Sequence, residues 1–134
     1  MKKLAFCLVL ALSGCAAPPE GISLLQLESQ QYHRDRRSFP LDFVGVQRAV
    51  IKHQQVCGSD IQFAVDDNHP GYARVTKPFA PGAQGLNNTI VLGLTKMANV
   101  QTRGDVYSYK TPTRAQIREI YQALLHPGEC EPSD

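Results

Sequence analysis

The sequence contains none of the short motifs that mark the common hydrolases, nucleotide-binding proteins and zinc proteases. Its 134 residues hold no Gly-x-Ser-x-Gly elbow, no His-Glu-x-x-His pair, no phosphate-binding loop and no dinucleotide fingerprint. Each of these motifs places a nucleophile, a metal or a phosphate through a fixed spacing of residues. We therefore expect a non-enzymatic protein with no cofactor and no resident metal.

The chain also lacks a strong excess of charge of either sign. It has 14 lysines and arginines against 12 aspartates and glutamates, and the excess comes from Lys2 and Lys3. A balanced chain has no electrostatic footprint for nucleic acid or for anionic lipid. The densest basic stretch, Arg34-Asp35-Arg36-Arg37, is short and contains a carboxylate. We interpret it as a solvated part of a tether.

No hydrophobic run near the N-terminus is long enough to span a membrane as a helix. The run from Leu4 to Leu12 has nine residues, whereas a helix needs about 20 to cross a bilayer. Two lysines precede this run and Ser13-Gly14 follow it, which is the order of a cleavable export signal. Residues 1–14 are therefore interpreted as a signal peptide that is removed.

The residues that end this signal, Leu12-Ser13-Gly14-Cys15, resemble the lipobox of bacterial lipoproteins. The resemblance implies that Cys15 is diacylated on sulfur, becomes the N-terminus after cleavage and is usually acylated again on nitrogen. Two or three acyl chains anchor a protein stably, at about 0.8 kcal/mol per buried methylene. Because Ala16 rather than an aspartate follows the cysteine, the resemblance implies transfer to the outer membrane. It names no ligand and no partner.

Two unmodified cysteines remain after processing, Cys57 and Cys130. In an oxidising envelope such a pair most simply forms one disulfide. Closing a loop of about 74 residues removes unfolded-state entropy worth about 4 kcal/mol in the chain-entropy model. The alternative is a zinc or thiol-active site, because His53 and His126 each precede one cysteine by four positions. Pro127-Gly128 interrupts the second pair, which favours the disulfide.

Residues 15–40 are interpreted as the acylated N-terminus and a flexible tether, and residues 41–134 as a single globular domain. Proline, glycine and charged residues fill most of the tether, and such a composition buries too little apolar surface to fold. A small apolar island at residues 22–27 interrupts it. Three locations remain open for this island: an edge strand, the surface of the domain and the membrane surface.

Helices are expected at both ends of the domain. The first spans about residues 41–56, with Asp42 as its N-cap and Gly58 at its end. The second is capped by Thr111 or Thr113 and ends before Pro127-Gly128, with apolar residues recurring at helical spacing from Ile117 to Leu125. Strand-forming runs lie between them at residues 61–65, 72–77, 89–95 and 106–110, with a turn expected at residues 103–105.

This order of elements predicts an α+β fold: helix, three- to four-stranded antiparallel meander, helix, with both helices on one face of the sheet. A disulfide between Cys57 and Cys130 would hold the C-terminal ends of the two helices together, because bridged Cα atoms lie within about 7 Å of each other. The pattern shows no internal repeat and no second domain.

Three aromatic residues are candidate contacts for a partner. Tyr107 and Tyr109 alternate onto one face of the last expected strand, and an exposed tyrosine pair is a usual contact for protein or glycan partners. Packing beneath the helices explains the pair equally well. Phe79 lies in the irregular stretch of residues 78–88, which would suit an inhibitor of a hydrolase if it protrudes as a rigid wedge.

These features predict a lipid-anchored outer-membrane lipoprotein, facing the periplasm or the cell surface. We expect it to act as a non-enzymatic binding or scaffolding module for another envelope or extracellular component, with a protein as its partner. Two alternatives stay open. One is a metal-binding or thiol-active protein that uses the histidines and cysteines described above, and the other is an inhibitor of a hydrolase.

Replacing Cys15 tests the anchor. In a bacterial host that is fed an alkyne fatty acid, the unchanged chain should be labelled and recovered with membranes. The Cys15→Ala variant should be unlabelled and depleted from membranes by at least about tenfold, because its acyl chains are missing. Cys7→Ala, within the discarded segment, is the matched control and should behave like the unchanged chain. Labelling of Cys15→Ala would contradict the lipobox interpretation.

Overall fold

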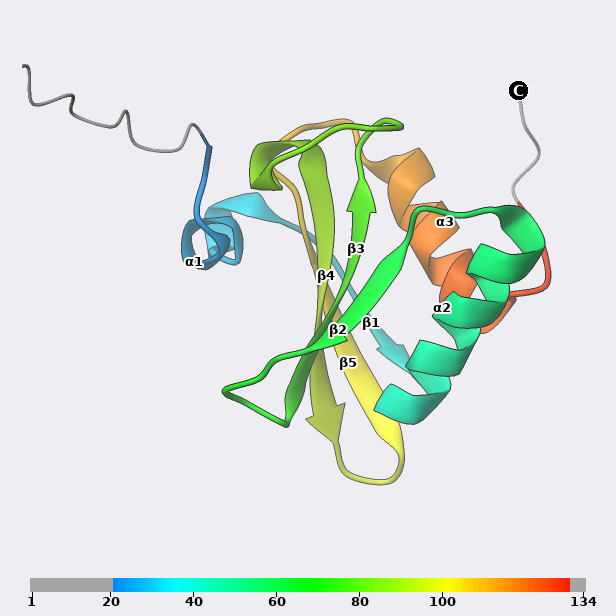
Figure 1. Ribbon diagram of the computed structural model, residues 1–134. Coiled ribbons are helices and arrows are strands. Elements are labelled where there is room, and N and C mark those ends of the chain that lie inside the picture. Colours follow the sequence, from blue (N-terminus) through cyan, green and yellow to red (C-terminus); the bar gives the residue numbers. More distant parts are fainter. Residues whose placement is uncertain (1–20, 131–134) are drawn as a thin grey trace, which may run out of the picture.

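An antiparallel sheet of five strands, in the spatial order β1-β5-β4-β3-β2, organises the chain (Figure 1). The structure is a computed structural model and describes residues 21–130. The expected signal peptide, Cys15 with its expected lipid and the first part of the expected tether lie outside the described residues. The strands are β1 (His33–Phe39), β2 (Gln62–Val65), β3 (Tyr72–Pro78), β4 (Thr89–Met97) and β5 (Gln101–Tyr107). The helices are α1 (Leu24–Leu27), α2 (Phe43–Cys57) and α3 (Arg114–Leu125), with 3-10 turns η1 (Gln30–Tyr32) and η2 (Leu86–Asn88).

The α+β class predicted from the sequence is confirmed, but the sheet has five strands rather than three or four. Strands β2 to β5 pair consecutively, and β1 pairs antiparallel with β5 at one end of the sheet. Residues 33–39, expected to belong to the flexible tether, form β1. The prediction of a tether rested on the charges of this segment and was wrong. Arg36 donates a hydrogen bond to Asp105 on β5, and Phe39 at the end of the strand is fully buried.

The long helices α2 and α3 lie side by side on one face of the sheet (Figure 1). The Asp42 side chain accepts a hydrogen bond from the Gly45 N–H at 2.7 Å and caps α2, and Gly58 ends the helix at a φ of 62°. Both expected helices are confirmed. Within residues 21–130, none of the helices has the length and hydropathy that a membrane crossing requires. The core between helices and sheet includes Phe39, Val46, Val50, Ile61, Val75, Ile90, Leu92, Leu94, Val106, Ile120 and Leu124.

The disulfide between Cys57 and Cys130 is present, with the two Cα atoms 5.5 Å apart. It joins the end of α2 to the segment that follows α3, as the sequence predicts. His53 is fully buried near this bond, and its Nδ1 lies 3.3 Å from the carbonyl oxygen of Pro127. No three histidines, cysteines or acidic residues within residues 21–130 converge in a way that would hold a metal ion. The alternative site of His53, Cys57, His126 and Cys130 is therefore not assembled in this structure.

The apolar island at residues 22–27 packs on the domain, opposite α2 and α3 (Figure 1). Ser23 and Gln26 form a capping box at the start of α1, with side chain to backbone distances of 3.2 and 3.0 Å. Leu27 is fully buried and lies outside the core between the sheet and the long helices. Glu28, directly after α1, pairs with Arg74 of β3. Together these contacts fix the location that the sequence left open.

The expected turn at residues 103–105 is wrong, because these residues lie in the middle of β5. The chain reverses instead just before β5, where Asn99 and Val100 have positive φ angles of 65° and 56°. Gly104 does not form a turn; the strand needs a glycine at this position because there is no space for a side chain. A Cβ at this position would lie 2.6 Å from Leu92 Cδ1 and 2.8 Å from Phe39 Cε2. The missing side chain thus makes room for the core contact between β1 and β4.

Adding that Cβ should therefore destabilise the fold. We expect Gly104→Ala to lower the free energy of unfolding by about 1–3 kcal/mol through overpacking. Urea denaturation monitored by circular dichroism measures this. Gly71→Ala is the matched control, since a Cβ there meets no atom within 4 Å, and it should change stability by less than about 0.5 kcal/mol. Equal effects of the two substitutions would contradict the steric account of Gly104.

Candidate functional site

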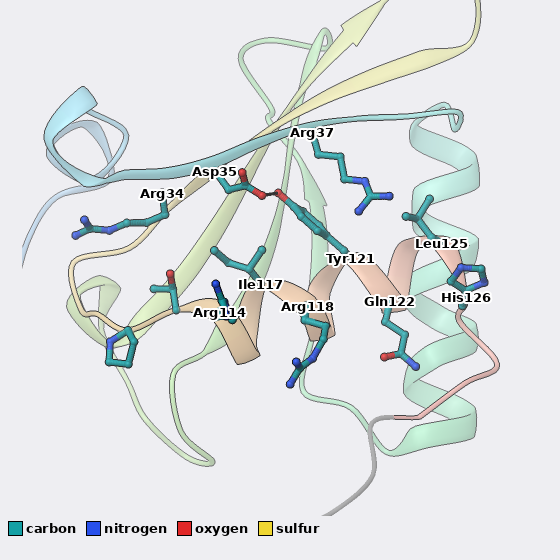
Figure 2. A pocket seen from close by; sticks show the side chains of 12 residues that line it. Arg34, Asp35, Arg37, Arg114, Ile117, Arg118, Tyr121, Gln122, Leu125 and His126 are labelled. Atoms are coloured by element: carbon teal, nitrogen blue, oxygen red, sulfur yellow. Dashed lines mark hydrogen bonds between the residues drawn. The ribbon is translucent and has the colours of Figure 1, made fainter.

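A groove of about 740 Å³ separates β1 from α3 (Figure 2). One wall comes from the start and middle of β1, and the other comes from one side of α3 along its whole length. Apolar and cationic side chains alternate in this lining, and one carboxylate is present. The lining residues are Arg34, Asp35, Arg37, Pro112, Thr113, Arg114, Ile117, Arg118, Tyr121, Gln122, Leu125 and His126.

Tyr121 forms the floor of the groove and fixes its width. Its hydroxyl donates a hydrogen bond to Asp35 Oδ2 at 2.6 Å, which ties α3 to β1. The Arg37 guanidinium lies 5.2 Å from the centre of its ring, within the range of a cation–π contact. Burial raises the pKa of the Tyr121 hydroxyl, and the hydrogen bond to Asp35 raises it further. The hydroxyl therefore remains a donor throughout the physiological pH range.

Arginines outnumber carboxylates among the residues that line the groove. Four arginines line it, and Figure 2 shows Arg34 and Arg37 on either side of Asp35 with Arg118 extending from α3. The Arg34 Nε donates to the carbonyl oxygen of Ser108 at 2.9 Å, which holds that side chain in place. The single carboxylate in the lining, that of Asp35, already accepts the Tyr121 hydroxyl. The arrangement therefore favours an anionic ligand.

The sequence of α3 adds to this charge rather than offsetting it. No acidic residue lies in the first turn, and the Thr113 side chain makes no capping hydrogen bond. Arg114 and Arg118 are four positions apart, where like charges repel on a helix surface, and Arg114 stands at the positive end of the helix dipole. Arg114 therefore lies where an anion would be favoured, at the end of α3 that borders the groove.

A second cavity, of about 310 Å³, lies on the opposite face of the sheet. Asp105 is buried beside it and receives Arg36 Nε at 2.6 Å and His33 Nε2 at 2.9 Å. Burial alone would raise the pKa of Asp105, but the hydrogen bonds from Arg36 and His33 and the charges of Arg36 and Arg103 outweigh it and lower the pKa. Asp105 thereby connects β1 and β5, whereas Arg103 Nε, 3.5 Å from Asp105 Oδ2, is buried there without a hydrogen-bond partner.

Arg74 of β3 completes the network on that face. It donates to Glu28 at 2.5 Å and to Asp66 at 2.8 Å. The hydrogen bond that Arg74 donates to Glu28, together with the one it donates to Asp66, outweighs the effect of burial and raises the pKa of Arg74 above its already high value. The same bond from Arg74, with the backbone N–H of Asn68, lowers the pKa of Asp66. The ion pairs that line this cavity thus hold the segment after α1 against the sheet.

The aromatic residues singled out in the sequence do not meet at one site. Tyr107 lies at the end of β5, with its ring centre 5.5 Å from that of His33 beside the second cavity. Tyr109 lies beyond the strand, 5.5 Å from the ring of Tyr32. Phe79 packs partly buried against the core. None of the three lines the groove between β1 and α3.

The sequence alone did not indicate the groove between β1 and α3. Its β1 wall lies in residues that were interpreted as a tether, and the arginines of α3 belong to no recognised motif. One signal was visible, the two like charges at the start of a helix that lacks acidic residues in its first turn. No model of a known protein family matches the chain, and no curated protein matches it significantly. The assignment of function therefore rests on the residues of the groove.

The buried Asp105 makes a testable contribution to stability. Its folded-state pKa lies below the unfolded value, so the carboxylate stabilises the fold above about pH 4 and loses this effect as the pH falls through the folded pKa. Asp105→Asn should lower the free energy of unfolding at pH 7 by about 1–3 kcal/mol. It should also flatten the decline of stability between about pH 5 and pH 2.

Thermal unfolding across this pH range measures both effects. Asp67→Asn, at an exposed position in the β2–β3 turn, is the matched control and should follow the unchanged protein. If Asp105→Asn and the unchanged protein decline in parallel, the ion network around Asp105 is not a source of acid sensitivity.

Proposed function

We propose that this protein is a lipid-anchored outer-membrane lipoprotein and a non-enzymatic binding module, and that the groove between β1 and α3 holds an acidic segment of a protein partner in the envelope. The observation that supports this most directly is the charge of the groove. Arg34, Arg37 and Arg114 line the groove, and the one carboxylate among the lining residues is bound to a tyrosine hydroxyl. A ligand with several carboxylates would neutralise these cations.

The chemistry of the lining favours a peptide over other anions. Arginine guanidinium groups bind carboxylates through paired N–H donors with good geometry. Ile117 and Leu125 line the groove between these cations, and a peptide can cover them with its aliphatic side-chain atoms and its backbone. Inorganic phosphate or a sugar phosphate would leave this apolar surface exposed to water. A protein segment therefore uses more of the groove than a small anion does.

The proposed anchor restricts where the partner can be. α1 begins nine residues after Cys15, and nine residues span at most about 30 Å when extended. A chain acylated at Cys15 would thus hold the groove close to the membrane surface. The partner segment then belongs to a protein that lies in or beside the same membrane.

In-cell photo-crosslinking tests the proposed function. A photoreactive phenylalanine derivative at position 122, in the groove, should yield a discrete protein adduct. The same residue at position 47, on an exposed part of α2, should yield none. Arg114→Glu should reduce the adduct from position 122 by about tenfold, because it replaces an attractive charge with a repulsive one.

Arg48→Glu supplies the matched charge reversal, since Arg48 is exposed on α2 and does not line the groove. It should leave the adduct within about twofold of the unchanged protein. Equal adduct yields from Arg114→Glu and Arg48→Glu would reject the groove as the binding site.

A further inference from the structure

We propose that the acidic partner segment binds as an added β-strand along the free edge of β1, with carboxylates at every second position directed into the groove. This inference rests on the proposed function, because it assumes that the groove holds an acidic protein segment. It adds the backbone conformation of the ligand, its approximate length and the spacing of its acidic residues.

β1 offers an edge to which a strand can add. Within residues 21–130, β5 is the one strand that pairs with β1, so β1 closes the sheet on that side. Every second residue of an edge strand directs its backbone N–H and C=O groups away from the sheet. These groups form a template for another chain, and main-chain hydrogen bonds supply much of the affinity when a peptide extends a sheet.

The groove lies where the side chains of such a strand would be. An added strand runs about 4.8 Å from β1, and its side chains alternate between the two faces of the sheet. Asp35 and Arg37, two positions apart on β1, both contact Tyr121 of α3 and so face the groove. Every second side chain of an added strand would face the same way. Those side chains would meet Arg114, Ile117 and Arg118 on the far wall.

The lengths of the two walls agree with a short peptide. The pairing register of β1 shifts between His33 and Asp35, so its regular part is the five residues 35–39. These correspond to about 17 Å of strand, and the twelve residues of α3 to about 18 Å of helix. An added strand of about six residues would cover the helix wall from end to end. Such a strand directs about three side chains into the groove, where Arg34, Arg37 and Arg114 line the walls.

The charge pattern selects an acidic segment over a second copy of this chain. β1 carries Arg34, Arg36 and Arg37 against the single carboxylate of Asp35. Pairing two copies edge to edge would bring these arginines together, and like charges on facing strands are destabilising. Charges on an edge strand do protect it from indiscriminate pairing. That role explains the arginines of β1, but it does not explain Arg114 on α3, which lines the same groove.

The other edge of the sheet lacks these features. β2 has four residues, none of them charged. It therefore presents a shorter template and no electrostatic selection. The difference between the two edges indicates that the basic groove beside β1 is a built feature rather than a general property of the sheet.

Backbone N-methylation separates strand addition from simple charge attraction. The probe is a fluorescein-labelled octapeptide of alternating Glu and Thr. The acylated chain in lipid nanodiscs is added to this peptide at increasing concentrations, and fluorescence anisotropy measures binding. One derivative is N-methylated at all Glu amides and a second at all Thr amides. In an added strand the amides of one set face β1 and those of the other face water. One derivative should therefore bind at least about tenfold more weakly than the parent, and the other within about threefold.

The outcomes distinguish the two levels of the proposal. Binding of the parent peptide that weakens with Arg114→Glu but not with Arg48→Glu, together with unequal effects of the two methylations, supports strand addition. The same charge dependence with equal effects of both methylations overturns strand addition and leaves the proposed function intact. No binding of the parent, or binding that Arg114→Glu and Arg48→Glu change alike, counts against the acidic ligand itself.

Discussion

The pairing of β1 with β5 is the constraint on which the rest of the structure depends. It brings Arg36 to the buried Asp105 on one face and Phe39 over Gly104 on the other. It also places Asp35 within reach of the Tyr121 hydroxyl, so that α3 is tied to the edge of the sheet. Without this pairing the chain would keep a four-stranded meander with two helices, but it would have neither the groove nor the ion network.

Both faces of β1 carry polar side chains that have partners, and its single apolar side chain, that of Phe39, is buried in the core. Alternating side chains send Arg36 to the open face and Asp35 and Arg37 to the helix face. Each face therefore supplies electrostatic and hydrogen-bonding contacts where a typical strand buries apolar groups on one side. Polar side chains on both faces have one advantage for an edge strand: they keep it hydrated and protect it from unspecific pairing when no ligand is bound.

The sequence predicted the elements whose signals are local. Asp42 and Gly58 mark the ends of α2, the apolar spacing marks α3, and the β-branched run marks β4. The pairing of Cys57 with Cys130 followed from their number and the expected compartment. These predictions succeeded because neighbouring residues determine capping and periodicity, and because two free cysteines have one way to pair.

The candidate site was not predictable, because its defining contacts join residues far apart in the chain. Arg36 and Asp105 are separated by 69 positions, and Asp35 and Tyr121 by 86. A charged stretch shows no apolar periodicity, so nothing local distinguishes a solvated tether from a strand whose charges are paired elsewhere. Gly104 misled for a related reason, since glycine marks a turn and a crowded strand equally.

The pair of Glu28 and Arg74 has a mechanical consequence. A pull on the N-terminus travels along the chain through α1 and reaches Glu28 before it reaches β1. Arg74 lies on β3, which is flanked by β2 and β4 and so lies inside the sheet. Part of the load would therefore pass into an interior strand. If the proposed anchor holds the chain at a membrane, a pull on that anchor would then be less able to peel the edge strand β1 from the sheet.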